Sequence, residues 1–323
     1  MNGQKILITG GSGSFGRKCI EILLERYPEI AEIRVYSRDE LKHYEMQHYC
    51  PWGKHPALQY ILGDIRHYER LVEAMQGVDV VLHAAALKHV QMAEANPSEF
   101  ISTNIIGSEN VFRAALGQKV AKVVAISTDK AAAPTGLYGA TKLCADKLFT
   151  AQHRGESTFA VLRYGNVMGT SGSVVPFFIK QKEKGRLSIT HPDMTRFHLS
   201  AEQSIDFVLD VLEKMRGREI FVPKLPSFRV VDLAKAIAPE AEIEWIGLRS
   251  GEKLHEDMIA QADAAQSIET ERYFIIVPEP KEGYLHWHAA KPVAADFAYN
   301  SLHNHHWLSV EDLRHLAAAH QSI

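Results

Sequence analysis

The feature that most constrains the fold is a glycine-rich turn between a strand pattern and a helix pattern near residue 10. The apolar run KILIT leads into GGSGSFG, which places Gly10, Gly13 and Gly16 at three-residue intervals. In such a turn the first glycine permits a tight bend, the second admits a diphosphate close to the backbone, and the third allows close helix packing. Free N–H groups at the helix N-terminus favour the same anion. The turn therefore predicts a dinucleotide site that includes Ser14 and Phe15.

Strand and helix patterns then alternate along the chain. Apolar strand patterns cover residues 5–11, 32–38, 58–64, 78–86, 120–128 and 157–167, and helix patterns cover 14–27, 39–49, 67–77, 98–116 and 138–153. Strict alternation implies parallel strands joined by right-handed crossovers, and strands that are apolar almost throughout imply that both sheet faces are covered. We therefore predict an α/β fold, with a Rossmann-like doubly wound parallel sheet over residues 1–165.

Ligands of such a sheet bind beyond the C-terminal ends of its strands. Because those ends converge in space, we expect the cofactor to contact residues that lie far apart in the chain, namely Ser37, Arg38, Asp64, Ile65, Ala84 and Ala85.

The rhythm changes after residue 165. Residues 166–323 contain a basic helix pattern, a short amphipathic helix at 228–239 and a polar stretch at 250–259 that we expect to enter a helix. We predict a smaller C-terminal substrate-binding part, with the helices 201–216 and 309–320 returning to pack on the first domain.

Composition excludes several classes of protein. The chain has 323 residues, 46% of them hydrophobic, and a net charge of −3, so it lacks the basic surface of a nucleic-acid-binding protein. No apolar run is long enough to cross a bilayer, and no signal-peptide pattern opens the sequence. Three scattered cysteines do not form a disulfide framework. We expect a cytoplasmic protein with no membrane or nucleic-acid partner.

The end of the second strand bears on cofactor choice. A site that prefers NAD usually has an acid there for the ribose 2′-hydroxyl. This chain has Ser37 and then Arg38, whose guanidinium can bind a 2′-phosphate. We therefore expect NADP rather than NAD. Asp39 and Glu40 keep NAD open, although Asp39 could instead cap the following helix.

The segment STDKAAAPTGLYGATK, at residues 127–142, holds two possible acid–base pairs. Tyr138 and Lys142 are four residues apart, so on a helix they share one face. A nearby ammonium favours the phenolate, which could take a hydroxyl proton while a hydride leaves the same carbon. Asp129 and Lys130 form a second pair, which suggests a further proton transfer nearby. Spacing alone also fits a turn aspartate beside a solvent-exposed lysine.

The glycine turn and the Tyr138–Lys142 pair together resemble the extended short-chain dehydrogenase/reductases that act on nucleotide sugars. The stretches HAAALKHVQMAEANP, STDKA, LYGATKLCADKLF, RYGNVMGTSGSVVPFF, MTRF and RSGEKLHE narrow the resemblance to the inverting UDP-N-acetylglucosamine 4,6-dehydratases. The match spans about residues 3–280 and departs from the family at His198, where the family has tryptophan.

The resemblance implies a hydro-lyase that oxidises C4 of the sugar, eliminates water across C5–C6 and returns the hydride to C6, so that tightly bound NADP is recycled in each turnover. Tyr138 with Lys142 would serve the oxidation, Lys130 would remove the C5 proton, and Asp129 would protonate the departing C6 oxygen. Reprotonation of C5 from the opposite face would give the L-arabino 4-keto product that begins pseudaminic acid synthesis. We expect a lowered pKa for Lys130 and a protonated Asp129 before reaction.

The same resemblance implies the substrate contacts. UDP-N-acetylglucosamine would meet Lys88 (also near the nicotinamide ribose), Thr128, Asn166, Arg196, Arg249 and Glu252. Thr128 could equally cap the end of a strand. The family forms closed homo-oligomers, often hexamers. Histidine clusters at 286–288 and 303–306 lack completing cysteines or carboxylates, so we expect no metal.

Three alternatives remain. A C5-retaining dehydratase of this type often has a membrane anchor and a methionine at the position of Tyr138. A UDP-N-acetylhexosamine 4-epimerase needs neither a C5 base nor a C6 acid. A non-catalytic NADP sensor would typically lose the Tyr138–Lys142 pair.

Overall fold

A computed structural model of the chain describes residues 1–169, 174–249, 251–278, 281–285 and 290–318. Its main element is a ten-stranded sheet in the order β15-β13-β14-β9-β6-β5-β4-β1-β2-β3. From β3 to β9 every neighbouring pair is parallel, and the pairs that involve β13 and β14 beyond that point are antiparallel. This order confirms the predicted doubly wound fold.

The six predicted strands are present with shorter bounds. They are β1 (Lys5–Thr9), β2 (Glu32–Ser37), β3 (Leu58–Leu62), β4 (Val80–His83), β5 (Lys122–Thr128) and β6 (Thr158–Tyr164). The sheet continues with β9 (Ile220–Pro223), β14 (Tyr273–Ile276), β13 (Ser267–Glu269) and β15 (Lys291–Pro292). Strands from the C-terminal half therefore extend the sheet, which the sequence did not indicate.

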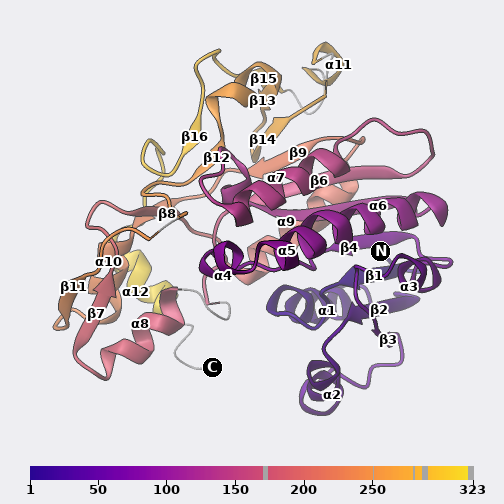
Figure 1. Cartoon of the computed structure of the whole chain (residues 1–323), viewed down its shortest axis with the longest axis horizontal. Coiled ribbons are helices and arrows are strands. Elements are labelled where there is room, and N and C mark those ends of the chain that lie inside the picture. The colour runs from indigo at the N-terminus through magenta and orange to yellow at the C-terminus, as the bar shows by residue number, and fades with distance from the viewer. Residues whose placement is uncertain (170–173, 250, 279–280, 286–289, 319–323) are drawn as a thin grey trace.

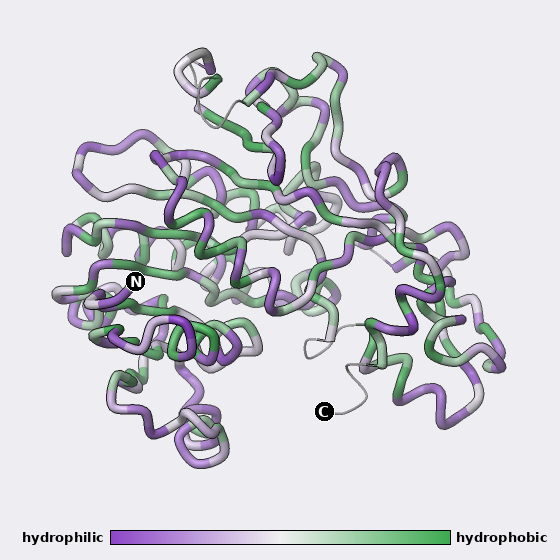
Figure 2. The backbone as a smooth tube through the Cα atoms, turned by 180° about the vertical axis from the view of Figure 1, so that it is seen from behind, coloured by the Kyte–Doolittle hydropathy of each residue, from purple (hydrophilic) through white to green (hydrophobic). Residues whose placement is uncertain are grey.

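Helices cover both faces of the sheet. The N-terminal half contributes α1 (Ser14–Arg26), α2 (Glu40–Tyr49), α3 (Tyr68–Ala74), α4 (Val90–Ala95), α5 (Pro97–Phe100), the π-helix η1 (Ile101–Ile106), α6 (Gly107–Gly117) and α7 (Leu137–Phe149). Helix α7 contacts β5 and β6 and adjoins α6, while α1 packs with α9 (Ala201–Lys214), which also contacts β5 and β6. Figure 2 shows hydrophobic stretches along these strands and helices, with hydrophilic residues in most connecting loops.

A second, smaller hydrophobic core lies to one side of the sheet (Figure 1). It is built from α8 (Val174–Lys182), α10 (Val230–Ile237), α12 (Val310–Ala318) and the strand pair β7 (Arg186–Ile189) and β11 (Glu242–Trp245). The helix predicted at 201–216 is α9, which packs against α1, β5 and β6 of the first domain. The same prediction for helix 309–320 is wrong, because Leu313 and Ala317 of α12 are buried against α10 in the second core.

The remaining elements are short and lie in the connections between the larger ones. They include the 3-10 helices η2 (Asp129–Ala131) and η3 (Gln261–Gln266), the pair β8 (Thr195–Phe197) and β10 (Ser227–Arg229), the pair β12 (Asp257–Ile259) and β16 (Tyr299–Asn300), and α11 (Glu282–Leu285). The polar stretch at 250–259 does not enter a helix as predicted, because its last residues form β12 against β16. The division at residue 165 stays a prediction.

Candidate active site

The glycine turn adopts the geometry that its sequence predicts. Gly10 has φ +68, and a Cβ on it would lie 2.9 Å from the backbone of Ala85, so the turn closes tightly on the end of β4. A Cβ on Gly16 would lie 2.3 Å from the Gly11 carbonyl oxygen, which shows that Gly16 permits packing behind the turn. Gly13 is the N-cap of α1, and no side chain caps that end. The first N–H groups of α1 are thus available to an anion.

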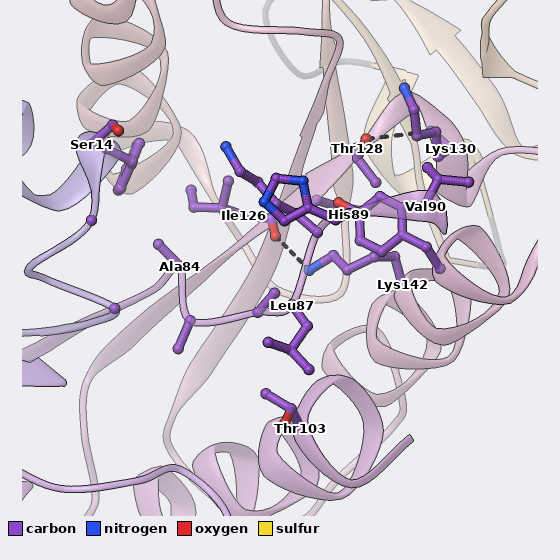
Figure 3. A pocket seen from close by; sticks show the side chains of 18 of the residues that line it. Ser14, Ala84, Leu87, His89, Val90, Thr103, Ile126, Thr128, Lys130 and Lys142 are labelled. Carbon is purple, nitrogen blue, oxygen red and sulfur yellow. Dashed lines mark hydrogen bonds between the residues drawn. The ribbon is translucent and has the colours of Figure 1, made fainter. Parts of the chain in front are cut away.

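A large cavity of about 1310 Å³ opens at the C-terminal ends of the parallel strands. Nearly all the predicted site residues line it: Gly10, Gly13, Ser14, Phe15, Ser37, Arg38, Asp64, Ile65, Ala84, Ala85, Lys88, Thr128, Lys130, Tyr138, Lys142, Asn166, Arg196, Arg249 and Glu252. Gly16 and Asp129 do not line it, since Gly16 lies behind the turn and Asp129 is fully buried. Figure 3 shows side chains from several distant segments facing this one space.

The end of β2 forms one wall of the cavity. The Ser37 hydroxyl lies 2.8 Å from the Ser12 hydroxyl and 2.6 Å from Nε2 of the buried His43. Arg38 is half exposed, and its guanidinium lies 3.5 Å from the Asp64 carboxylate. Asp39 accepts a hydrogen bond from Lys42 N and caps α2. Its carboxylate therefore caps the helix, although Asp39 also lines the cavity.

Tyr138 and Lys142 lie on the first turns of α7 and are both buried. Lys142 Nζ donates to the Ile126 carbonyl oxygen at 2.8 Å, the contact drawn in Figure 3. Burial lowers the pKa of Lys142, and the more distant Asp146 only partly opposes it. Burial also raises the pKa of Tyr138 to about 12, although the Lys130 charge acts in the opposite direction. In this arrangement Tyr138 is a phenol, so its conversion to a base depends on a further positive charge.

The predicted helix at 98–116 forms, but its middle part, between α5 and α6, is the π-helix η1, which carries Asn104. The buried Asn104 side chain accepts from Leu87 N at 2.8 Å and donates to Leu87 O at 2.9 Å and to Thr141 Oγ1 at 3.0 Å. Thr141 in turn donates to the Tyr138 carbonyl oxygen. Asn104 therefore fixes the loop after β4 against the helix that carries Tyr138. The sequence did not single it out.

Asp129 and Lys130 follow β5 directly, and Lys130 also contacts the buried carboxylate of Glu256 from a distant segment. Lys130 Nζ donates to Asp129 Oδ1 and to Glu256 Oε1, both at 3.1 Å, and to Asn166 Oδ1 at 3.3 Å. Thr128 donates its hydroxyl to Asp129 Oδ1 at 2.9 Å and caps η2. Glu256 was not among the predicted site residues, although it belongs to the matched stretch RSGEKLHE.

The charges of this cluster overturn one expectation. Burial lowers the pKa of Lys130, but the Asp129 and Glu256 carboxylates outweigh burial, so that the net pKa is raised instead of lowered. Burial and the Glu256 charge raise the pKa of Asp129, which agrees with a protonated Asp129. Burial opposes ionisation of Glu256, yet Lys130 and Arg196 together lower its pKa. Lys130 is thus an ammonium at neutral pH.

The predicted substrate side has one buried and one exposed arginine. Arg196 donates to the carbonyl oxygens of Thr195, Lys253 and Leu254 and lies 3.5 Å from Glu252 Oε1. Most of its donors are therefore already engaged, whereas Arg249 stays exposed at the cavity edge.

Burial lowers the pKa of Lys88, which lines the cavity. His198 is buried and does not line it. The histidines at 286–288 lie outside the described residues, and His303, His305 and His306 are exposed. Among the residues that the structure describes, no group of three or more histidine, cysteine or acidic side chains could hold a metal ion.

Residues 6–278 match the model of a family described as polysaccharide biosynthesis protein. The chain belongs to this family. It is 46% identical, over 97% of its length and 96% of the relative's, to a UDP-N-acetylglucosamine 4,6-dehydratase (inverting) of Campylobacter jejuni subsp. jejuni serotype O:2. A UDP-glucose 4-epimerase of Rickettsia akari is 41% identical over 97% of this chain and 95% of that protein. The resemblance found in the sequence to the inverting dehydratases is confirmed.

Solved structures agree on the fold. The X-ray structure of Pen from Bacillus thuringiensis matches 100% of this chain and 99% of that chain, with a TM-score of 0.90 and 34% identity. The dTDP-glucose 4,6-dehydratase DesIV from Streptomyces venezuelae, solved with NAD bound, matches 78% of this chain and 87% of that chain, with a TM-score of 0.69 and 23% identity. Within the described part of the chain, every helix is too short or too polar to span a bilayer.

Proposed function

We propose that the protein is a UDP-N-acetylglucosamine 4,6-dehydratase that inverts C5 and releases UDP-2-acetamido-2,6-dideoxy-β-L-arabino-hex-4-ulose. The observation that carries this proposal is that Lys130, in contact with Asp129, lines the same cavity as Tyr138 and Lys142. One bound hexose can therefore meet both acid–base pairs. The 46% identity to the inverting dehydratase of Campylobacter jejuni supports the same substrate and outcome.

Each pair has its own proton to move. A nicotinamide dinucleotide bound at the glycine turn would supply the hydride chemistry between C4 and C6. Tyr138 takes the C4 hydroxyl proton, and the resulting ketone acidifies the hydrogen on C5. Lys130 removes the C5 proton while Asp129 gives its proton to the departing C6 oxygen, so that water leaves. The proton that C5 finally takes up balances the one that Tyr138 removed, and the net change is loss of water.

The residues of the glycine turn fit such a dinucleotide. The uncapped N-terminus of α1 faces the cavity through Gly13, Ser14 and Phe15. Gly10 also lines the cavity, and it has no side chain to cover the backbone of the turn. These groups would hold the diphosphate, and Lys142 would hold the nicotinamide ribose.

We further propose that the dinucleotide is NADP, held tightly and recycled. Arg17, Arg38 and Lys42 line the cavity near the end of β2, where a 2′-phosphate would need positive charge. Each of them is paired with an acid of the same wall, and the Arg38–Asp64 pair is the longest of the three at 3.5 Å. Asp39 caps α2, which gives its carboxylate a role other than binding the ribose 2′-hydroxyl, although Asp39 also lines the cavity. NAD is the competing cofactor, since DesIV was solved with NAD bound. Replacing Arg38 with alanine should weaken NADP binding on the order of 10-fold and leave NAD binding unchanged, as titration calorimetry would measure.

One incubation tests the activity. Purified protein, UDP-N-acetylglucosamine and deuterated water, without added dinucleotide, should give a 6-deoxy-4-keto sugar with deuterium at C5. Product NMR distinguishes the alternatives, because a C5-retaining dehydratase gives the other C5 configuration and an epimerase keeps the 6-hydroxyl. The second alternative has support from the 41% identical UDP-glucose 4-epimerase of Rickettsia akari. Recovery of unchanged sugar would favour a non-catalytic NADP sensor.

Two broader expectations belong to the same proposal. The product would enter a pathway of the pseudaminic acid type, and the enzyme would work as a homo-oligomer in the cytoplasm. Light scattering of the purified protein would measure the number of chains in the assembly.

A further inference from the structure

Glu256 is a buried carboxylate that the mechanism above does not use. Its side chain is 1% exposed, its Oε1 accepts a hydrogen bond from Lys130 Nζ at 3.1 Å and lies 3.6 Å from Arg196 Nε. Its Oε2 is also buried, and it has no hydrogen-bond partner among the described residues. Ser301 holds the backbone of Glu256 through both its hydroxyl and its N–H group, so the carboxylate is fixed in place.

A buried carboxyl with an unpartnered oxygen costs free energy unless that oxygen is used. The Glu256 carboxylate faces Lys130 of η2, Arg196 of β8 and Lys253 of its own loop, while Asp129 lies on the far side of Lys130. Glu252 and Asp257 offset Arg196 and Lys253, so the cluster is neutral when Asp129 carries a proton and Glu256 is the counterion of Lys130. Glu256 is then the carboxylate of this cluster that can still take up a proton.

Lys130 faces a chemical difficulty in the proposed reaction. It forms hydrogen bonds as an ammonium to two carboxyl groups, and an ammonium cannot remove a proton from C5. Asp129 cannot accept the ammonium proton, because it must still protonate the C6 oxygen. Glu256 Oε1 is in direct hydrogen-bond contact with Lys130 Nζ, and it is the acceptor that remains.

We propose that Glu256 is a positioning residue that acts through Lys130 by accepting its ammonium proton. An N–H bond of Lys130 breaks and an O–H bond forms on Glu256, which leaves a neutral amine and a neutral carboxylic acid. The amine takes the C5 proton and Asp129 gives its own proton to the C6 oxygen. The Glu256 proton then returns through Lys130 to Asp129. The cluster gains one proton from C5 and loses one to water, with no oxidant or reductant.

This inference rests on the proposed function, so the wild-type enzyme is measured first. Absence of a 6-deoxy-4-keto product from the wild type would overturn both proposals. With a working wild type, Glu256→Gln should lower kcat on the order of 10²-fold at neutral pH, with KM changed less than about 3-fold. In a single turnover, formation of reduced dinucleotide should persist while deuterium exchange at C5 falls.

The pH profile separates proton transfer from a merely structural role. The wild type passes the proton internally, so its kcat should be nearly independent of pH around neutrality. In Glu256→Gln the proton must leave to solvent, so kcat should rise with pH as Lys130 itself deprotonates. An unchanged kcat and profile, or a higher kcat at neutral pH, would show that Glu256 only keeps Lys130 charged and would overturn the inference.

Two further variants complete the experiment. Glu256→Asp keeps a proton acceptor on a shorter side chain, so it should keep the flat profile with an intermediate kcat. If Glu256→Gln does not fold, Glu256→Asp tests the inference by itself. A wild-type kcat in Glu256→Asp would show that the 3.1 Å contact between Lys130 Nζ and Glu256 Oε1 is not needed, and would overturn the inference. Glu252→Gln is the matched control, since Glu252 lies 3.5 Å from Arg196 on the substrate side. It should raise KM and keep the wild-type profile.

Discussion

The two lysines of the site lie in one cavity, yet their pKa values shift in opposite directions. Lys142 Nζ donates to a carbonyl oxygen, and the nearby Asp146 is already paired with Arg163 at 2.9 Å. Lys130 Nζ contacts two carboxyl groups at 3.1 Å. Burial acts in the same direction on both lysines, so the carboxylates decide the sign of the net shift. A lysine's place in an active site therefore does not by itself make it a base.

Removing the side chain of Lys130 should have the largest effect. Lys130→Ala should lower the rate of water release from the sugar on the order of 10³-fold, because it removes the amine proposed to take the C5 proton. Formation of reduced dinucleotide in a single turnover should survive, because the Tyr138–Lys142 side is untouched. Product NMR and absorbance report the two steps separately. Near-wild-type water release would show that Lys130 is not the C5 base, and the functional contrast between Lys130 and Lys142 would no longer hold.

The other side of the comparison is tested with Tyr138→Phe. The phenyl ring should keep its edge-on packing against Phe100, so the fold should survive. The loss of the hydroxyl should slow C4 oxidation on the order of 10²-fold, and elimination should fall with it because no ketone forms. Single-turnover absorbance measures the first step. Normal dinucleotide reduction in this variant would show that another group takes the hydroxyl proton.

Stability should also separate the two lysines. Lys130→Met removes the cation that contacts both buried carboxyl groups and leaves Glu256 with only the longer contact to Arg196. We expect a loss of about 2–3 kcal/mol at neutral pH, because Lys130 is partly exposed. Lys142→Met removes a desolvated ammonium together with one hydrogen bond, so its effect should stay within about 1 kcal/mol. Urea denaturation of the two variants measures this difference. Equal losses would show that the carboxylates do not distinguish the lysines.

The smallest expected effect concerns acid. Lowering the pH should reduce the difference in unfolding free energy between the wild type and Lys130→Met. In the wild type the pKa of Glu256 is lowered, so its contribution is present above the unfolded pKa and lost as pH falls through the folded pKa. In the variant the nearest cation is absent and Arg196 alone lies close to Glu256, so the pKa of Glu256 should be higher than in the wild type and protonation should destabilise the variant less. The two unfolding free energies should approach each other by about 1 kcal/mol from pH ~7 to pH ~4.5. A difference in unfolding free energy that stays constant with pH would contradict the assignment of this effect to Glu256.

The parts of the fold that local patterns encode were predictable. Alternating apolar runs predicted all six strands from β1 to β6, and the glycine spacing predicted the turn at Gly10. The short antiparallel strands β13, β14 and β15 were not predicted. A three-residue strand such as β13 has too few residues to show a period, and its place depends on a distant partner.

The candidate site shows the same division. Local spacing and family resemblance pointed to Asp129, Lys130, Tyr138 and Lys142. Glu256 lies 126 residues from Lys130 in the chain, and no local pattern joins the two. For that reason the sequence predicted a lowered pKa for Lys130, when its neighbours in space raise it.

The sequence by itself determined the order of strands and helices as far as β6, the glycine turn, and the candidate acid–base pairs Asp129–Lys130 and Tyr138–Lys142. These follow from backbone preferences and from residue types a few positions apart. Only the tertiary structure decided which charges meet, because electrostatic energy depends on distance in space and on burial, neither of which is local in the chain.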